Sequence, residues 1–258
     1  MTYVSFESRL DGPVAIVTLN RPERRNALDE QAVGEIEDYF SRPPKEVRAI
    51  VLAANGSHFC AGLDLKEHYA KERSPAEFMR VCQGWHRAFD RIQHGGIPVV
   101  AALQGAIVGG GLELASAAHV RVGDRSTYFA LPEGQWGIFT GGGATVRVAR
   151  IITPNRMIEM MLTGRVMDCE EGVRTGLLNY LTPAGAALEK AVALAHKIAG
   201  NAPLSNYSIV SGINKVWDMS ATDGLFTESL LAALVQTSPE VQGRLRDFVE
   251  KRTEKLSA

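Results

Sequence analysis

Two uninterrupted apolar segments constrain the fold of this chain more than any other feature. Residues 49–54 and 97–104 lack the alternation of a half-exposed strand, which predicts strands buried on both faces of a sheet. Residues 75–92, which lie between them, have the pattern of a long helix. A strand, helix, strand order predicts a parallel crossover, so we expect an α/β fold with a mostly parallel sheet.

The other elements follow from turn residues and apolar periodicity. Strands are predicted at 4–9 and 15–20, joined as a hairpin by Asp11-Gly12-Pro13, and at 120–123 and 128–131. Helices are predicted at 28–39, from the triplet Gly141–Gly143 to 150, and then at 154–162, 168–176, 187–200, 203–216 and 222–251. Because helices dominate the end of the chain without a linker, we predict a core domain over 1–200 and a helical C-terminal region over 201–258.

Composition excludes several classes of function. The formal net charge is -1, which gives no reason to expect nucleic-acid or anionic membrane binding, and Arg147, Arg150 and Arg156 are predicted to form a solvated helix face. The three cysteines are scattered, so we expect free thiols and neither a metal site nor a disulfide framework. No targeting or membrane-spanning segment is recognisable, which favours a cytoplasmic protein.

A glycine-rich turn follows the second buried strand. Gly105 and the triplet Gly109–Gly111 precede a helix that carries Glu113. Glycine allows backbone N–H groups to approach a ligand closely, and a helix N-terminus adds unpaired donors that stabilise an anion or oxyanion. The residues do not match a P-loop or a dinucleotide-binding turn. Close strand–helix packing without a ligand is the alternative.

Two glutamates are candidate proton-transfer groups. Glu113 lies in the first turn of a helix among apolar neighbours, where it either complements the helix dipole or transfers protons beside the glycine turn. Glu133 follows a strand at a turn, where a side chain is either solvated or displayed for function. Neither residue decides between these alternatives by itself.

Several motifs together resemble the enoyl-CoA hydratase/isomerase (crotonase) superfamily over nearly the whole chain. The motifs occur in the family's order, and they are Asn20-Arg21-Pro22 with Asn26-Ala27-Leu28, residues 59–65 (FCAGLDL), residues 105–115 (GAIVGGGLELA), Leu131-Pro132-Glu133, residues 161–164 (MLTG), Gly176-Leu177 and residues 248–252 (FVEKR). The resemblance implies a crotonase-like spiral of ββα units and a homotrimer or homohexamer, with the C-terminal helices as the assembly element.

The resemblance also assigns residues to a coenzyme A thioester. It implies an oxyanion hole formed by the backbone N–H groups of Leu63 and Gly110. It implies that the 61–66 loop, which begins at Ala61, binds the coenzyme A thioester, with the adenine end along Leu63, Asp64, Leu65 and Lys66 and with Lys251 at the phosphates. Arg24 either assists at the phosphates or is simply solvated. No separate cofactor is implied, because coenzyme A is part of the substrate.

The presence of both acids favours a hydratase within the superfamily. Glu113 is then expected to deprotonate water and Glu133 to protonate the α-carbon of the thioester. Isomerases of the family commonly keep only the second acid. Dehalogenases need an aspartate where this chain has Gly141, so His86 is predicted to have a packing or hydrogen-bonding role.

A hydroxycinnamoyl-CoA hydratase-lyase is the closest alternative. Residues 61–67 and Glu133 with Trp136-Gly137-Ile138 resemble that group, but its members carry serine in place of Glu113 and tyrosine in place of His68. Trp136 and Phe139 either line an acyl pocket or pack in the core. A non-catalytic RNA-binding homologue is a further alternative, and it requires a clustered basic surface.

Overall fold

A mixed sheet organises the structure, a computed structural model that describes residues 3–250. Its strands lie in the order β1 (Phe6–Asp11), β2 (Val14–Leu19), β3 (Ala49–Ala54), β4 (Val99–Leu103), β6 (Val120–Asp124) and β9 (Tyr180–Thr182). The β1–β2 pair is an antiparallel hairpin, and every other neighbouring pair is parallel. The predicted α/β class, the hairpin and the two buried parallel strands are therefore confirmed.

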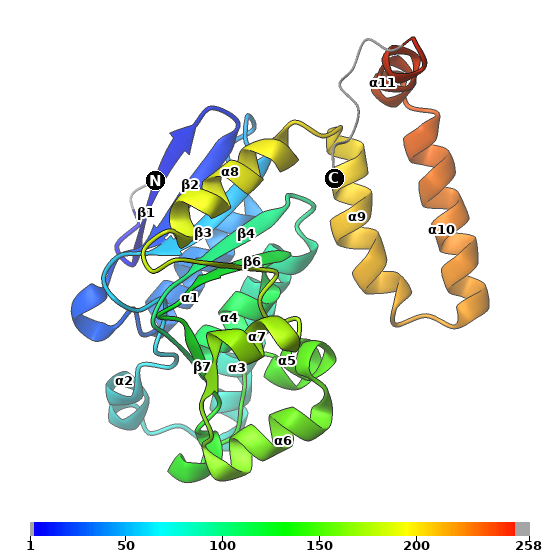
Figure 1. Cartoon of the computed structure of the whole chain (residues 1–258). Helices are drawn as coiled ribbons and strands as arrows, with labels where there is room; N and C mark the ends of the chain where they lie inside the picture. Colours follow the sequence, from blue (N-terminus) through cyan, green and yellow to red (C-terminus); the bar gives the residue numbers. More distant parts are fainter. Residues whose placement is uncertain (1–2, 251–258) are drawn as a thin grey trace.

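Helices cover the large sheet on both faces (Figure 1). On one face lies α8 (Ala187–Ala199), whose buried alanines recur every four residues and pack against β2, β3, β4 and β6. The opposite face is covered by α1 (Glu30–Ser41), α3 (Pro75–His94) and α4 (Gly110–Ala117), which share one apolar core with it. This second layer carries the functional groups described below.

A small second sheet includes the strand that connects β4 to α4. Its strands are ordered β5 (Ala106–Val108), β7 (Tyr128–Ala130) and β8 (Met167–Asp168). The turn from β4 to β5 passes through Gly105, which has φ +57° and would place a Cβ 2.1 Å from Ser57 O. Because only glycine fits there, β5 leads directly to the N-terminus of α4.

Short elements complete the core, and they are η1 (Pro22–Arg24), α2 (Leu65–Ala70), η2 (Glu133–Trp136), α5 (Ala144–Ile152), α6 (Pro154–Thr163) and α7 (Cys169–Arg174). Helix α2 starts inside the segment that we predicted as a loop. Asp64 caps it, since its side chain accepts a hydrogen bond from the Glu67 N–H.

The C-terminal helices extend away from the sheet as an arm (Figure 1). The arm consists of α9 (Pro203–Val216), α10 (Ala221–Gln236) and α11 (Pro239–Val249). The single helix predicted over 222–251 is wrong, because the chain breaks at Thr237-Ser238 and Pro239 starts a new helix without an N–H to donate. No helix in residues 3–250 is long and apolar enough to cross a membrane.

Candidate active site

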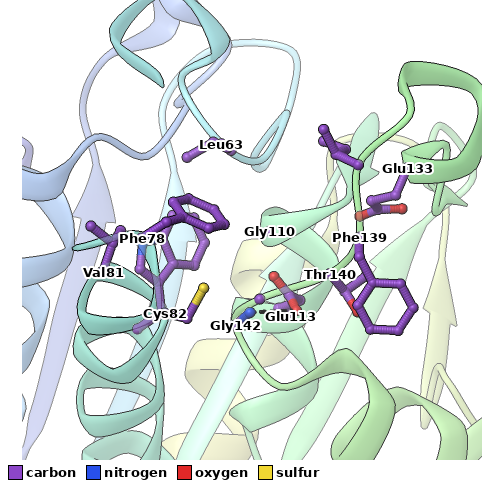
Figure 2. A pocket seen from close by; sticks show the side chains of 13 residues that line it. Leu63, Phe78, Val81, Cys82, Gly110, Glu113, Glu133, Phe139, Thr140 and Gly142 are labelled. Carbon is purple, nitrogen blue, oxygen red and sulfur yellow. Dashed lines mark hydrogen bonds between the residues drawn. The ribbon is translucent and has the colours of Figure 1, made fainter. Parts of the chain in front are cut away.

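A pocket between α3, the N-terminus of α4 and the 133–142 segment holds both predicted acids (Figure 2). Its empty volume is about 420 Å³ and it opens to solvent. The lining is mostly apolar, and it consists of Leu63, Phe78, Val81, Cys82, Trp85, Gly110, Glu113, Glu133, Ile138, Phe139, Thr140, Gly141 and Gly142. Two carboxyl groups in such a lining are candidates for proton transfer.

Glu113 lies in the first turn of α4 and is 3% exposed. Its Oε1 accepts hydrogen bonds from the backbone N–H groups of Gly142 at 2.8 Å and Ala144 at 3.0 Å. Burial raises the pKa of Glu113, while these two donors and the charge of Arg147 oppose that rise by favouring the ionised form. Glu113 is therefore fixed in direction and supplied with donors that suit a carboxylate.

Glu133 starts the short helix η2 and is 6% exposed. Its Oε2 is buried, and no group in residues 3–250 forms a hydrogen bond with it. Burial raises the pKa of Glu133 to about 7, and the negative charge of Glu113 adds to this rise. The sequence left open whether the Glu133 side chain is solvated at the turn. The structure shows that it is buried, and a pKa of about 7 corresponds to an acid that is half protonated near neutral pH.

The N–H groups of Leu63 and Gly110 lie close together beside the acids. A Cβ on Gly62 would come within 3.0 Å of Gly110 N, and a Cβ on Gly110 would lie 3.4 Å from Leu63 N. Among the described residues, neither N–H has an acceptor. Gly62 has φ +91°, and a Cβ there would also lie 2.6 Å from Val108 O, so glycine is needed for this approach. Two neighbouring N–H groups without acceptors are what an oxyanion hole requires, and this role stays a prediction.

The predicted coenzyme A loop contributes Leu63 to the lining of the pocket. The Ala61 N–H donates to Arg25 O, while Leu65 and Lys66 form the exposed first turn of α2. Asp64 is buried and pairs with Arg24 at 3.1 Å. The Arg24 side chain is 56% exposed and pairs with this loop through Asp64, and its role at the phosphates of coenzyme A stays a prediction.

The remaining residues singled out from the sequence lie partly inside and partly outside the pocket. Phe139 lines the pocket, whereas Trp136 is 66% exposed and does not line it. The packing role predicted for His86 is wrong, because its side chain lies on the exposed side of α3. Lys251 lies outside the described residues. Within residues 3–250, no group of His, Cys, Asp or Glu is arranged to hold a metal ion.

Of the three arginines predicted as a solvated helix face, Arg150 is exposed and Arg156 is half-buried, but the prediction is wrong for Arg147. Arg147 is buried, and its guanidinium contacts Asp90, Gln93 and the carbonyl of Gly142. Arg150 pairs with Asp218, and Arg156 with Glu171. The sequence carried a signal that we missed: Arg147 lies three residues after Ala144 and next to Val148, in line with the buried stripe of α5.

The arrangement combines an oxyanion site with two acids in different environments. Paired N–H donors stabilise negative charge on a carbonyl oxygen, and the two carboxyl groups differ in hydrogen bonding and in pKa. Such a site suits proton transfer next to a carbonyl group that has become an enolate.

Comparisons with known proteins agree with this geometry. A family model described as enoyl-CoA hydratase/isomerase matches residues 9–257. The chain is 30% identical over 246 residues to the Mycobacterium tuberculosis enoyl-CoA hydratase EchA19, an alignment that covers 93% of this chain and 92% of that protein.

Solved structures give the same result for the fold. A candidate enoyl-CoA hydratase from Rhodopseudomonas palustris superposes with a TM-score of 0.93 at 43% identity, covering 99% of this chain and 100% of that one. An enoyl-CoA hydratase from Bacillus anthracis superposes with a TM-score of 0.90 at 27% identity, covering 98% of each chain. The predicted crotonase-like fold is confirmed, and the chain belongs to the enoyl-CoA hydratase/isomerase family of the crotonase superfamily.

Proposed function

We propose that the protein is an enoyl-CoA hydratase, which adds water to the α,β double bond of an acyl-CoA thioester. One observation carries the proposal: Glu113 and Glu133 line one pocket beside the free N–H groups of Leu63 and Gly110. Hydration needs a base, an acid and a site for the enolate oxygen, and this pocket supplies all of these. The names of relatives and solved structures support the same activity.

The oxyanion site receives the thioester carbonyl. When water adds to the β-carbon, electrons move onto the carbonyl oxygen, and the N–H groups of Leu63 and Gly110 stabilise the resulting enolate. Loss of one donor of this type typically slows a reaction ~10²–10³-fold. Because both donors are backbone groups, the rigidity of the Gly62 and Gly109–Gly111 segments determines their alignment.

The two acids divide the proton transfers. Glu113 removes a proton from water as the oxygen bonds to the β-carbon, and Glu133 delivers its proton to the α-carbon. Backbone donors to Glu113 favour a carboxylate, while the pKa of Glu133 near 7 keeps a protonated fraction available. A proton returned from Glu113 to Glu133 through water restores the starting state.

The apolar lining fits an acyl group. Phe78 on α3 and Phe139 lie on opposite sides of the pocket (Figure 2), and Val81 and Ile138 also line it. Both aliphatic and aromatic acyl groups match this lining, so the substrate class is an enoyl thioester of coenzyme A. In this proposal, the exposed 65–66 turn and Arg24, which pairs with Asp64, bind the nucleotide part of coenzyme A.

We further propose that the protein assembles as a homotrimer or homohexamer. The arm of helices α9–α11 exposes large apolar side chains to a degree unusual for a monomer surface. These are Ile209, Ile213, Trp217, Leu225, Phe226, Leu230, Leu234, Phe248 and Val249. A second copy of the chain would cover them.

A panel of thioesters tests the proposed activity. Crotonyl-CoA, longer 2-enoyl-CoA and hydroxycinnamoyl-CoA are each scored for hydration, for a shift of the double bond and for release of an aldehyde. Hydration without aldehyde is the expected result. A double-bond shift without hydration would identify an isomerase, and aldehyde from hydroxycinnamoyl-CoA would identify a lyase; either result would overturn the proposal.

A further inference from the structure

Glu113 owes its orientation to the segment that follows the pocket. Its Oε1 accepts from the N–H groups of Gly142 and Ala144, and a Cβ on Gly142 would lie only 2.6 Å from its Oε2. The carboxylate therefore rests directly on the backbone of residues 142–144. Any displacement of this backbone moves the base that the proposed hydration depends on.

Residues 140–143 have few interactions of their own that would hold them. Gly141, Gly142 and Gly143 have no side chains, and the buried Thr140 Oγ1 has no partner among the described residues. Gly143 has φ +106° and provides no side-chain cap for α5. The segment thus needs support from another part of the structure.

Arg147 provides that support. Its Nη1 donates to Gly142 O at 3.1 Å, which is the carbonyl of the same residue whose N–H binds Glu113. The arginine reaches this carbonyl by passing over Gly143, where a Cβ would lie 2.2 Å from Nη1. The glycine at 143 is therefore required for the arginine to fold back over the segment.

The same guanidinium is anchored on α3. Its Nε donates to Gln93 Oε1 at 2.6 Å, and its Nη2 donates to Asp90 Oδ1 at 2.5 Å. The Arg147 side chain is 6% exposed, whereas that of Asp90 is 55% exposed. A buried, forked donor with three separate acceptors is fixed in direction, and it joins α3 to the segment that binds Glu113.

We propose that Arg147 is a positioning residue that fixes the Gly142 peptide and thereby orients Glu113. This role rests on the proposed hydratase function, in which Glu113 is the base. The positive charge of Arg147 also lowers the pKa of Glu113 against the effect of burial, so geometry and charge act in the same direction. Arg147 lines a second pocket together with the titratable or charged residues Asp90, His94, His119, Arg121, Arg150 and Asp218, and the charge of Glu113 also acts on it.

Arg147→Met and Arg147→Lys test the role, with Arg150→Met as a matched control on the same helix. Arg147→Met is expected to lower kcat about 10²-fold, as misplaced catalytic groups do, with KM nearly unchanged. The acidic limb of its kcat/KM profile should move to higher pH, since Glu113 loses a neighbouring cation. Arg147→Lys keeps the positive charge, so the acidic limb of its kcat/KM profile should stay near the parental position. Its kcat should lie between that of the parent and that of Arg147→Met. Arg150→Met should behave like the parent.

A purely structural role predicts a different pattern, in which stability falls but the folded fraction keeps the parental kcat and pH profile. That result would overturn the proposal. If Arg147→Met does not fold, Asp90→Ala removes one anchor from the protein surface, and parental kcat in that variant would also overturn it. Glu113→Gln is measured in parallel: if it still hydrates substrate, the proposed function fails, whereas an inactive Glu113→Gln beside a fully active Arg147→Met refutes only the positioning role.

Discussion

Glu113 and Glu133 line the same pocket but differ in hydrogen bonding. Two backbone N–H groups bind Glu113 Oε1, whereas Glu133 Oε2 is buried with no partner in residues 3–250. Donors stabilise a carboxylate, and burial favours a neutral acid. This difference supports the proposed roles, with Glu113 on α4 as the base and Glu133 after β7 as the acid.

Replacing either acid by glutamine is expected to stop hydration without preventing substrate binding. Glutamine keeps an oxygen that accepts from Gly142 and Ala144, so Glu113→Gln preserves the geometry but removes the base. Each single variant should lose ~10²–10⁴ in kcat, because general acid–base groups contribute about that much. Acyl-CoA affinity, measured by calorimetry, should change little, since the oxyanion donors are backbone groups.

The double variant gives the control for this pair. Groups that act as a unit are not additive, so its loss should be smaller than the product of the single losses. Hydration at near-parental rate in folded Glu113→Gln would contradict the assignment. A severe effect of Glu133→Gln beside a mild effect of Glu113→Gln would point to double-bond isomerisation.

Glu133 makes both activity and stability depend on pH. Its pKa is raised from 4.5 to about 7, so the protonated acid is lost as pH rises through 7, and kcat/KM should fall above that pH. Between these two values the folded state binds more protons than the unfolded state, so the contribution of Glu133 to stability falls as pH rises through the same window. Glu133→Gln removes this pH-dependent contribution to stability.

Thermal unfolding checks the stability part. The stability of Glu133→Gln relative to the parent should increase between about pH 5 and about pH 8, even though the variant is inactive. Glu7→Gln, a change on the exposed side of β1, serves as a matched control that should leave the pH dependence unaltered. A relative stability of Glu133→Gln that is independent of pH would show that this carboxyl titrates normally.

Much of the core follows from sequence, because buried strands and capped helices leave local signals. Residues 49–54 are a strand with the predicted bounds, and α9 spans the predicted 203–216. The short strands β5, β8 and β9 were not predicted, because two or three residues have no measurable periodicity. Pro239 was the signal for the break between α10 and α11, and our single-helix prediction passed over it.

The site is predictable only where its chemistry lies in a contiguous motif. Glu113 and the glycines before it are neighbours in sequence, and the structure brings them to the pocket with Glu133 and Leu63. Arg147 is different, because its partners Asp90 and Gln93 lie more than fifty positions earlier in the chain. Its burial depends on tertiary packing, so an exposed helix face was the wrong expectation.

Assembly is expected to depend on the apolar arm. Light scattering of the parent should give a trimer or hexamer, and Phe226→Glu should reduce the particle mass, because a charge in a buried interface lacks a partner. Phe226 is 65% exposed on α10. Thr222→Glu, on an exposed position of the same helix, is the matched control. A monomeric parent across working concentrations would contradict the proposed assembly.

Gly62 lies next to both proposed oxyanion donors, so a substitution there tests their role. Gly62 and Gly12 both have positive φ, +91° and +58°, so alanine at either site strains the backbone by about 1–3 kcal/mol. Only Gly62 has close neighbours, since its Cβ would lie 2.6 Å from Val108 O and 3.0 Å from Gly110 N, whereas nothing lies within 4 Å of a Cβ on Gly12.

Both alanine variants should therefore unfold more easily, but Gly62→Ala alone should lose ~10²–10³ in kcat by separating the two N–H donors. Chemical denaturation and hydration assays on the pair measure the two effects separately. Equal kcat in both variants would mean that the Leu63 and Gly110 donors do not stabilise the transition state, because the strain is shared and only the contact with the donors differs.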